Sequence, residues 1–87
     1  MLRITSIRVN GSPLTLKLEG KIFAEWVDLL ERECLSRIAR KEPVVLDMAG
    51  VTYLDDRGIA LLRNLPARYI SLANRSDFVV ELLDKGE

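Results

Sequence analysis

Two adjacent carboxylates, a guanidinium and a glycine stand together in the stretch TYLDDRGIALL, residues 52–62. Asp55 and Asp56 follow a short extended run and precede an amphipathic pattern, so they lie where a strand would give way to a helix. An aspartate at a helix start can accept hydrogen bonds from the free N–H groups of the first turn. Capping needs only one of them and does not explain Gly58, which usually marks close approach by another backbone or by a partner. The stretch therefore either only caps a helix or also binds something.

The composition excludes several kinds of chemistry. The chain has 87 residues, no histidine and one cysteine, Cys34. Ser-His and Cys-His catalysis, histidine metal sites and an internal disulfide are therefore not available to it. Thirteen basic residues balance thirteen acidic ones without a basic run, so we expect no nucleic-acid partner. Apolar runs are far shorter than the ~20 residues of a membrane span, and the N-terminus is unlike a signal peptide. We expect one cytoplasmic domain, residues 1–87, without membrane insertion.

Hydrophobic periodicity predicts a mixed α/β fold. We expect strands at residues 2–9, 14–20, 44–46 and 68–74, and helices at residues 24–40, 57–65 and 75–87. The dipeptide Asn10-Gly11 predicts an antiparallel hairpin of the first two strands, with a bulge at residues 5–6. A right-handed crossover through the first helix then makes the third strand parallel to the second. The order ββαβαβα predicts a small four-stranded mixed sheet with its helices on one face.

Some side chains have predictable places in these elements. Cys34 lies on the apolar stripe of the first long helix and should be buried, whereas Trp26 belongs either to the core or to a partner surface near its rim. Either Ser76 or Asn74 should cap the last helix. Its inward side chains are expected to be Phe78, Val79, Leu82 and Leu83.

The segment VVLDMAGVTYLDDRGIALL, residues 44–62, resembles the signature of the STAS domain, named for sulphate transporters and anti-sigma factor antagonists. The stretches LTLKLEGKI and SLANRSDFVVELLD are similar to the family's second strand and to its fourth strand with the following helix. The resemblance implies a docking module without catalytic activity or cofactor. In the antagonist branch, it implies a partner that is an ATP-using serine kinase and also sequesters a sigma factor. This kinase phosphorylates a serine in an Asp-Ser-Ser/Thr-Gly motif, and the added charge ejects the module.

The sequence departs from this motif where the phosphate would be accepted. Asp55 matches the motif aspartate and Gly58 its glycine, but Asp56 stands at the position of the phosphorylatable serine and Arg57 at that of the second hydroxyl. We therefore expect no phosphorylation in this loop. Asp56 carries a charge of about −1, against about −1.5 to −2 for phosphoserine. It either imitates the phosphorylated state permanently or serves, with Arg57, in ordinary docking.

The resemblance also indicates where a partner would bind. The predicted partner-binding residues are Asp55, Asp56, Arg57, Gly58, Lys21 and Ile22. Lys21 and Ile22 belong to the loop EGKIF, which in the family lies at the same end as the motif, although Ile22 and Phe23 can equally staple the next helix to the sheet. Family members continue through another strand and helix, whereas this chain stops at Glu87. We expect an open sheet edge there, which would suit a homodimer.

Three functions remain to be compared. The first is a non-catalytic interaction module of bacterial signalling that regulates transcription as an anti-sigma factor antagonist does. The second is a small STAS subunit of an ABC-type lipid or other transporter. The third, an enzyme or small-molecule binder, is disfavoured because the chain lacks histidine. A magnesium cluster of Asp47, Asp55 and Asp56 is also disfavoured, since no suitable lysine follows at a strand end; we expect no metal.

Overall fold

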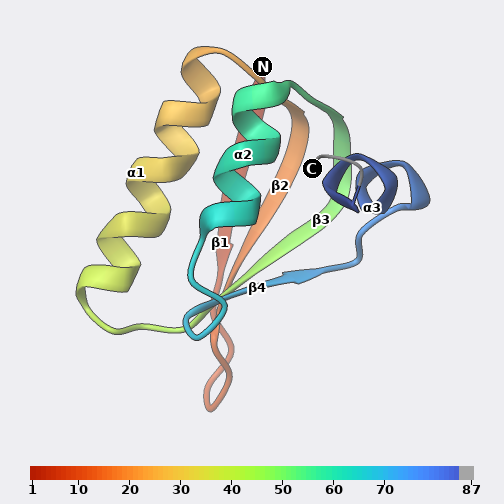
Figure 1. Ribbon diagram of the computed structural model, residues 1–87. Helices are drawn as coiled ribbons and strands as arrows, with labels where there is room; N and C mark the ends of the chain where they lie inside the picture. Colours follow the sequence, from red (N-terminus) through yellow and green to blue (C-terminus); the bar gives the residue numbers. More distant parts are fainter. Residues whose placement is uncertain (85–87) are drawn as a thin grey trace.

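Four strands form one mixed sheet, and helices cover one of its faces (Figure 1). The computed structural model describes residues 1–84. Its elements are β1 (Leu2–Ile7), β2 (Leu14–Ile22), α1 (Glu25–Ala39), β3 (Val44–Leu54), α2 (Asp56–Asn64), β4 (Ile70–Ala73) and α3 (Asp77–Asp84). The strand order is β1-β2-β3-β4; β1 runs antiparallel to β2, and the other neighbours are parallel. The predicted element order and mixed sheet are confirmed.

The core lies between the sheet and the helices because the strands alternate. Leu14, Leu16 and Leu18 of β2 are buried, while the intervening Thr15 and Lys17 point to the opposite, open face. Rows of apolar residues continue across the parallel strands, and Leu16 lies in register with Leu46 of β3. Burying one leucine side chain contributes about 1.5–3 kcal/mol. This face therefore determines which side of the sheet the helices must cover.

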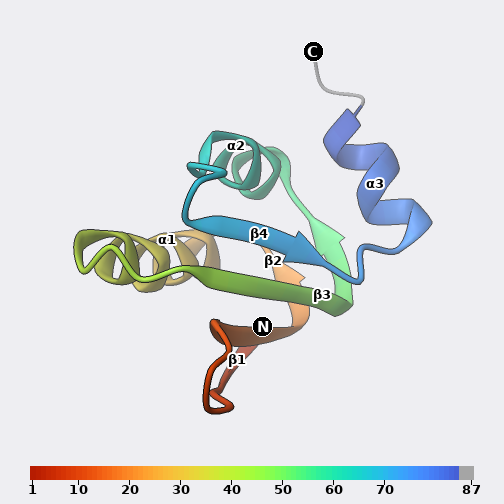
Figure 2. The ribbon, with the colours of Figure 1, turned by 90° about the horizontal axis from the view of Figure 1, so that it is seen from below.

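The helices follow one another in the order α1, α2, α3 in both views of the molecule (Figures 1 and 2). Val27, Leu30 and Cys34 bury one side of α1, which confirms the predicted place of Cys34. Trp26 is half-buried and packs against the core. α2 ends at Asn64, two residues before Pro66, as expected for a residue that cannot continue a helix. Within residues 1–84, no helix has the length and apolar character needed to cross a membrane.

Two predictions about the strands are wrong. The β1–β2 ladder is continuous, without a bulge at residues 5–6, and the register shifts occur instead between β2 and β3. β3 has 11 residues rather than three, because the part read as a connection continues the strand. A Cβ on Gly50 would come within 2.9 Å of the Leu18 carbonyl oxygen, so only glycine lets β3 pass the irregular part of β2. That irregularity interrupts the alternation of buried and exposed residues, so the sequence pattern does not indicate a strand there.

The prediction that Phe78 faces the core is wrong, because of where α3 begins. The Ser76 hydroxyl accepts a hydrogen bond from the Val79 N–H at 3.2 Å, so Ser76 is the capping residue rather than Asn74. In this phase Val79 and Leu83 face the core, and Phe78 is 47% exposed. Residues 85–87 of the predicted helix lie outside the described residues.

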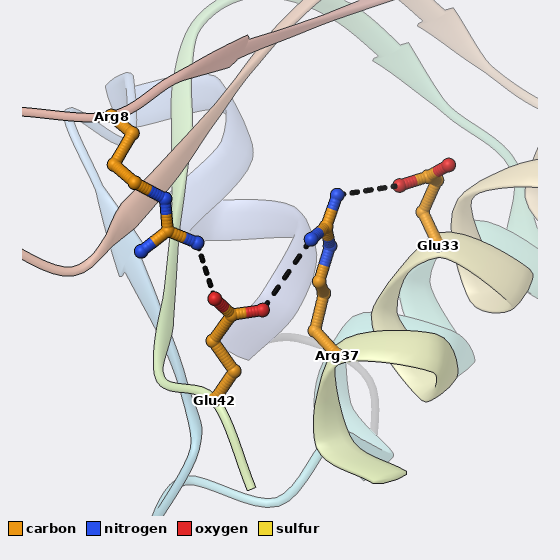
Figure 3. Close-up of polar contacts among 4 residues, drawn as sticks. All are labelled: Arg8, Glu33, Arg37 and Glu42. Carbon is orange, nitrogen blue, oxygen red and sulfur yellow. Dashed lines mark hydrogen bonds and ion pairs between the residues drawn. The ribbon is translucent and has the colours of Figure 1, made fainter. Parts of the chain in front are cut away.

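Ion pairs join the hairpin to the end of α1, away from the start of α2 (Figures 1 and 3). Glu42 accepts from Arg8 on one side and from Arg37 at 3.4 Å on the other, and Arg37 also faces Glu33 at 4.0 Å. The hydrogen bond from Arg8, with that from Arg37, lowers the pKa of Glu42 below its usual value. These contacts tie the first two strands to the α1–β3 connection.

Candidate functional site

The Asp55 side chain joins the starts of two helices. Asp55 is the N-cap of α2, and its Oδ1 accepts a hydrogen bond from the Gly58 N–H at 2.8 Å. Its Oδ2 accepts another from the N–H of Ala24, the N-cap of α1, at 2.9 Å. Ala24 has a φ of 49°, which is uncommon for a residue with a side chain. Asp55 therefore satisfies one free amide at each helix start and holds the β2–α1 loop in place.

The electrostatics of Asp55 follow from these contacts. Partial desolvation acts to raise the pKa of its carboxyl group. The backbone N–H groups of Ala24 and Gly58, and the charge of Arg57, outweigh that effect, and the pKa is lowered below its usual value. The group therefore stays ionised down to lower pH than a free aspartate. Its two oxygens are engaged inside the molecule, which leaves Asp55 in a positioning role.

Gly58 and Ile22 are also engaged inside the molecule. A Cβ on Gly58 would come within 2.9 Å of the Ile22 carbonyl oxygen and 3.1 Å of the Ile22 Cγ2. The close approach that the glycine permits is therefore that of α2 to the end of β2. The Ile22 side chain is 0% exposed and belongs to the core. Ile22 and Gly58 therefore pack the site from within, and their contact with a partner stays a prediction.

Arg57 connects α2 to α1. Its guanidinium donates to Asp28 Oδ1 at 2.7 Å and to the Ala24 carbonyl oxygen at 3.5 Å. Both members of the ion pair are more than half exposed, so the pair adds little to stability, about 0–1 kcal/mol. It does hold the guanidinium over the start of α1. Arg57 thus presents a cation that is already partly neutralised.

Asp56 differs from its neighbours because its carboxylate is free. It lies exposed in the first turn of α2, and within residues 1–84 its side chain makes no hydrogen bond or ion pair. The partial positive charge at a helix start favours an anion at this place. Of the two adjacent aspartates, Asp55 therefore has the capping role and Asp56 is available to solvent or to a partner.

The sequence reasoning missed an aromatic pair beside this loop. Phe23 and Tyr53 meet edge to face, with ring centroids 6.4 Å apart and planes at 73°. Together with Lys21 they line a shallow hollow of about 180 Å³. Tyr53 lies outside the predicted third strand, residues 44–46, but it belongs to β3 and is in register with Lys21 of β2. The available signal was the occurrence of an aromatic residue at the carboxyl end of each of two neighbouring strands.

A second depression lies between α1 and α2. It has a volume of about 290 Å³ and is lined by Val27, Glu31, Arg57, Ala60, Leu61 and Asn64. It reaches the loop through Arg57, so the surface around the start of α2 has hollows on two sides.

The three aspartates considered for magnesium do not come together as a metal site. Within residues 1–84, no group of three or more carboxylate or thiol side chains is placed to hold a metal ion. Asp47 instead accepts hydrogen bonds from the Ala49 N–H at 3.0 Å and from Asn74 Nδ2 at 3.1 Å. The first of these bonds, helped by the second, lowers the pKa of Asp47. Asp47 therefore has a structural role where β3 and β4 end their pairing.

Solved structures are similar to this fold. The anti-sigma factor antagonist SpoIIAA, in its unphosphorylated form, matches with a TM-score of 0.74 and 13% identity over 97% of this chain and 84% of that chain. A protein with a SpoIIAA-like fold from Shewanella loihica PV-4 matches with a TM-score of 0.60 and 14% identity, covering 88% of this chain and 69% of that one. The structure of Mglu matches at 0.66 with 23% identity, over 84% of this chain but only 20% of its own. These likenesses show the fold.

Comparison by sequence identifies the family. No curated protein matches the chain. The family model described as "STAS domain" matches residues 5–86, which includes every element from β2 to α3 and the second half of β1. The order of elements and the sheet agree with the resemblance noted in the segments around residues 14–22, 44–62 and 71–84. The chain belongs to the STAS domain family.

Proposed function

We propose that this STAS domain is a non-catalytic protein-interaction module of bacterial signalling, related to the anti-sigma factor antagonists, that docks through the start of α2. The observation that carries the proposal is the free carboxylate of Asp56, at the position where the family motif has its phosphorylatable serine. Its neighbours Asp55 and Gly58 are used to hold this turn against β2 and α1. The loop thus presents a fixed negative charge in a rigid frame.

The partner proposed is a serine-kinase-type anti-sigma factor or a related regulator. Asp56 would contact a cationic group of that partner, and the neighbouring apolar surface would supply most of the affinity. Because no hydroxyl stands at residues 55–58, phosphorylation there cannot release the complex. The module would therefore act as a constant competitor for its partner, controlled by its concentration.

The test is co-purification of the tagged domain from its native host, followed by mass spectrometry. The variant is Asp56→Arg, and the matched control is Asp77→Arg, which reverses another exposed aspartate in the first turn of a helix. We expect an anti-sigma-type kinase with the wild type and the control but not with Asp56→Arg. Recovery of an ABC-type ATPase instead would assign the domain to a transporter. Equal recovery with Asp56→Arg would reject docking at this carboxylate.

A second variant separates docking from imitation of phosphoserine. Asp56→Ser removes the charge and restores the motif hydroxyl. If Asp56 is a docking residue, Asp56→Ser weakens binding to the purified partner in titration calorimetry without ATP. If Asp56 imitates the phosphorylated, ejected state, the same change strengthens binding. Incubation with the kinase and ATP should label Asp56→Ser and leave the wild-type loop unlabelled.

A further inference from the structure

The aromatic pair and its lysine form a surface that the family motif does not include. Lys21 and Tyr53 are paired in register at the ends of β2 and β3. Their successors Ile22 and Leu54 are buried in the core, so Lys21 and Tyr53 point away from the helix-covered face. Phe23 closes the hollow by its edge-to-face contact with Tyr53. The hollow is therefore built by the backbone pairing of two strands.

The hollow exposes apolar surface in a place where a partner can reach it. Tyr53 is 44% exposed, and Phe23 beside it is partly exposed. Aromatic residues are enriched in the parts of interfaces that contribute most to affinity. Phe78 is similarly exposed at 47%, but it lies on α3 and lines neither of the two hollows beside the α2 start.

The volume of the hollow indicates what size of group can bind in it. Pockets for small molecules and cofactors usually measure about 300–1,000 Å³. The hollow measures about 180 Å³ and is shallow, which suits one bulky side chain rather than a cofactor. A single side chain seated in such a hollow is the usual form of an interface anchor.

The charges around the hollow indicate which group of the partner should lie next to the bound side chain. Lys21 is exposed, and within residues 1–84 its ammonium group forms no ion pair. Asp55 binds backbone amides and Asp28 binds Arg57, and within the described residues no ion pair joins Lys21 to the free carboxylate of Asp56. The unmatched cation at the hollow is therefore complementary to a carboxylate from outside.

The hollow is held at a constant position relative to the start of α2. Phe23 immediately precedes Ala24, whose N–H binds Asp55, and Tyr53 lies two residues before Asp55 in the chain. The Asp55 N–H also donates to the Ile22 carbonyl oxygen at 3.1 Å. The hollow and the start of α2 therefore keep a fixed position relative to each other.

We infer that the hollow of Lys21, Phe23 and Tyr53 receives one bulky apolar side chain from a segment of a protein partner, with an adjacent carboxylate of that segment paired to Lys21. This inference rests on the proposed function, because it gives the docking module an anchor point. It also specifies the partner segment by chemistry, as an apolar residue next to aspartate or glutamate.

The experiment is selection of binders from a random-peptide phage library on the intact domain, followed by titration of the enriched peptides. We expect a shared pattern of a bulky apolar residue beside Asp or Glu. Tyr53→Ala should weaken these peptides about tenfold, while Tyr53→Phe and the exposed-aromatic control Phe78→Ala leave affinity unchanged. Lys21→Glu, used for a second selection, should change the enriched neighbour from acidic to basic. Thermal unfolding of each variant verifies that it is folded.

Defined results would overturn the inference. These are no enrichment above that on Tyr53→Ala, equal losses with Phe78→Ala, or the same acidic neighbour selected on Lys21→Glu. The titration also separates this inference from the proposed function. If the affinity of the peptides falls with Tyr53→Ala but not with Asp56→Arg, the inference about the hollow holds and docking at Asp56 is contradicted. If their affinity falls with Asp56→Arg but not with Tyr53→Ala, only the inference about the hollow is rejected.

Discussion

The carboxylate of Asp55 shows how one residue can determine the geometry of a whole loop. It accepts one hydrogen bond from α2 and one from the residue that begins α1. A capping aspartate normally serves only its own helix. Here the second bond crosses to another element, so the two helix starts are fixed relative to each other, and the adjacent Asp56 is left free.

Asp55→Ala should therefore cost more than the loss of an ordinary cap. We expect a decrease in the free energy of unfolding of about 2 kcal/mol, from about 1 kcal/mol for the cap and a similar amount for the bond to the Ala24 N–H. Urea unfolding measures it. Asp56→Ala is the matched control and should change stability by no more than about 0.5 kcal/mol. Equal effects at the two positions would contradict the assignment of roles.

Gly58→Ala tests whether the glycine is kept for packing. Alanine is favoured over glycine within a helix by about 1 kcal/mol, so an unobstructed position would gain stability. A Cβ here would come within 2.9 Å of the Ile22 carbonyl oxygen, and overpacking of this kind costs about 1–3 kcal/mol. We expect net destabilisation in the same urea experiment. An increase in stability would show that α2 can move away from β2 without cost.

At the scale of elements, α1 connects the site to the core. Its start is held by Asp55 and by the ion pair of Asp28 with Arg57, whereas its middle is buried against the sheet. Its last turn joins the network of Arg37 and Glu42. The exposed ion pairs contribute little energy, so burial of the apolar side holds the helix, and the polar contacts set its direction.

Cys34 reports on whether α1 stays packed. Burial, with smaller contributions from Glu33 and Glu31, raises the pKa of the thiol to about 11. Because the thiolate is the reactive form, we expect no alkylation by iodoacetamide at pH 8 in the folded protein and full alkylation in urea. Mass spectrometry distinguishes the two. Rapid alkylation without denaturant would mean that α1 opens from the sheet under native conditions.

For the whole molecule, the pH dependence of stability follows from three carboxylates. The pKa values of Asp55, Asp47 and Glu42 are all lowered in the folded state. The folded protein thus binds fewer protons than the unfolded chain, whose values are about 3.9 for Asp and 4.3 for Glu. Their contribution is complete above those values and is lost as pH falls through the lower folded ones. We expect the melting temperature to drop below about pH 4.

The variant Asp55→Asn measures how much the Asp55 carboxylate contributes to the pH dependence of stability. The variant cannot lose a charge at position 55, so its melting temperature should change less between pH 5 and pH 2 than that of the wild type, although it starts lower. Asp77→Asn is the control, since within residues 1–84 that side chain makes no hydrogen bond or ion pair. Parallel curves for the wild type and Asp55→Asn would mean that the acid-sensitive contacts lie elsewhere.

Local pattern was sufficient for the order of strands and helices, the buried place of Cys34 and a cap at one of the two aspartates, because alternation, helical spacing and capping preference are properties of short stretches. The length of β3 was missed because Gly50 and its neighbours follow an irregular partner strand. Only the tertiary structure decided which site residues are used internally and which remain free. Ala24 and Asp55, for example, are 31 positions apart, and the contact between them depends on how α1 returns the chain to the sheet. The same packing turns Ile22 inward and leaves Lys21 and Tyr53 at the surface, since neighbouring residues of a strand face opposite sides, and it leaves Asp56 exposed in the first turn of α2.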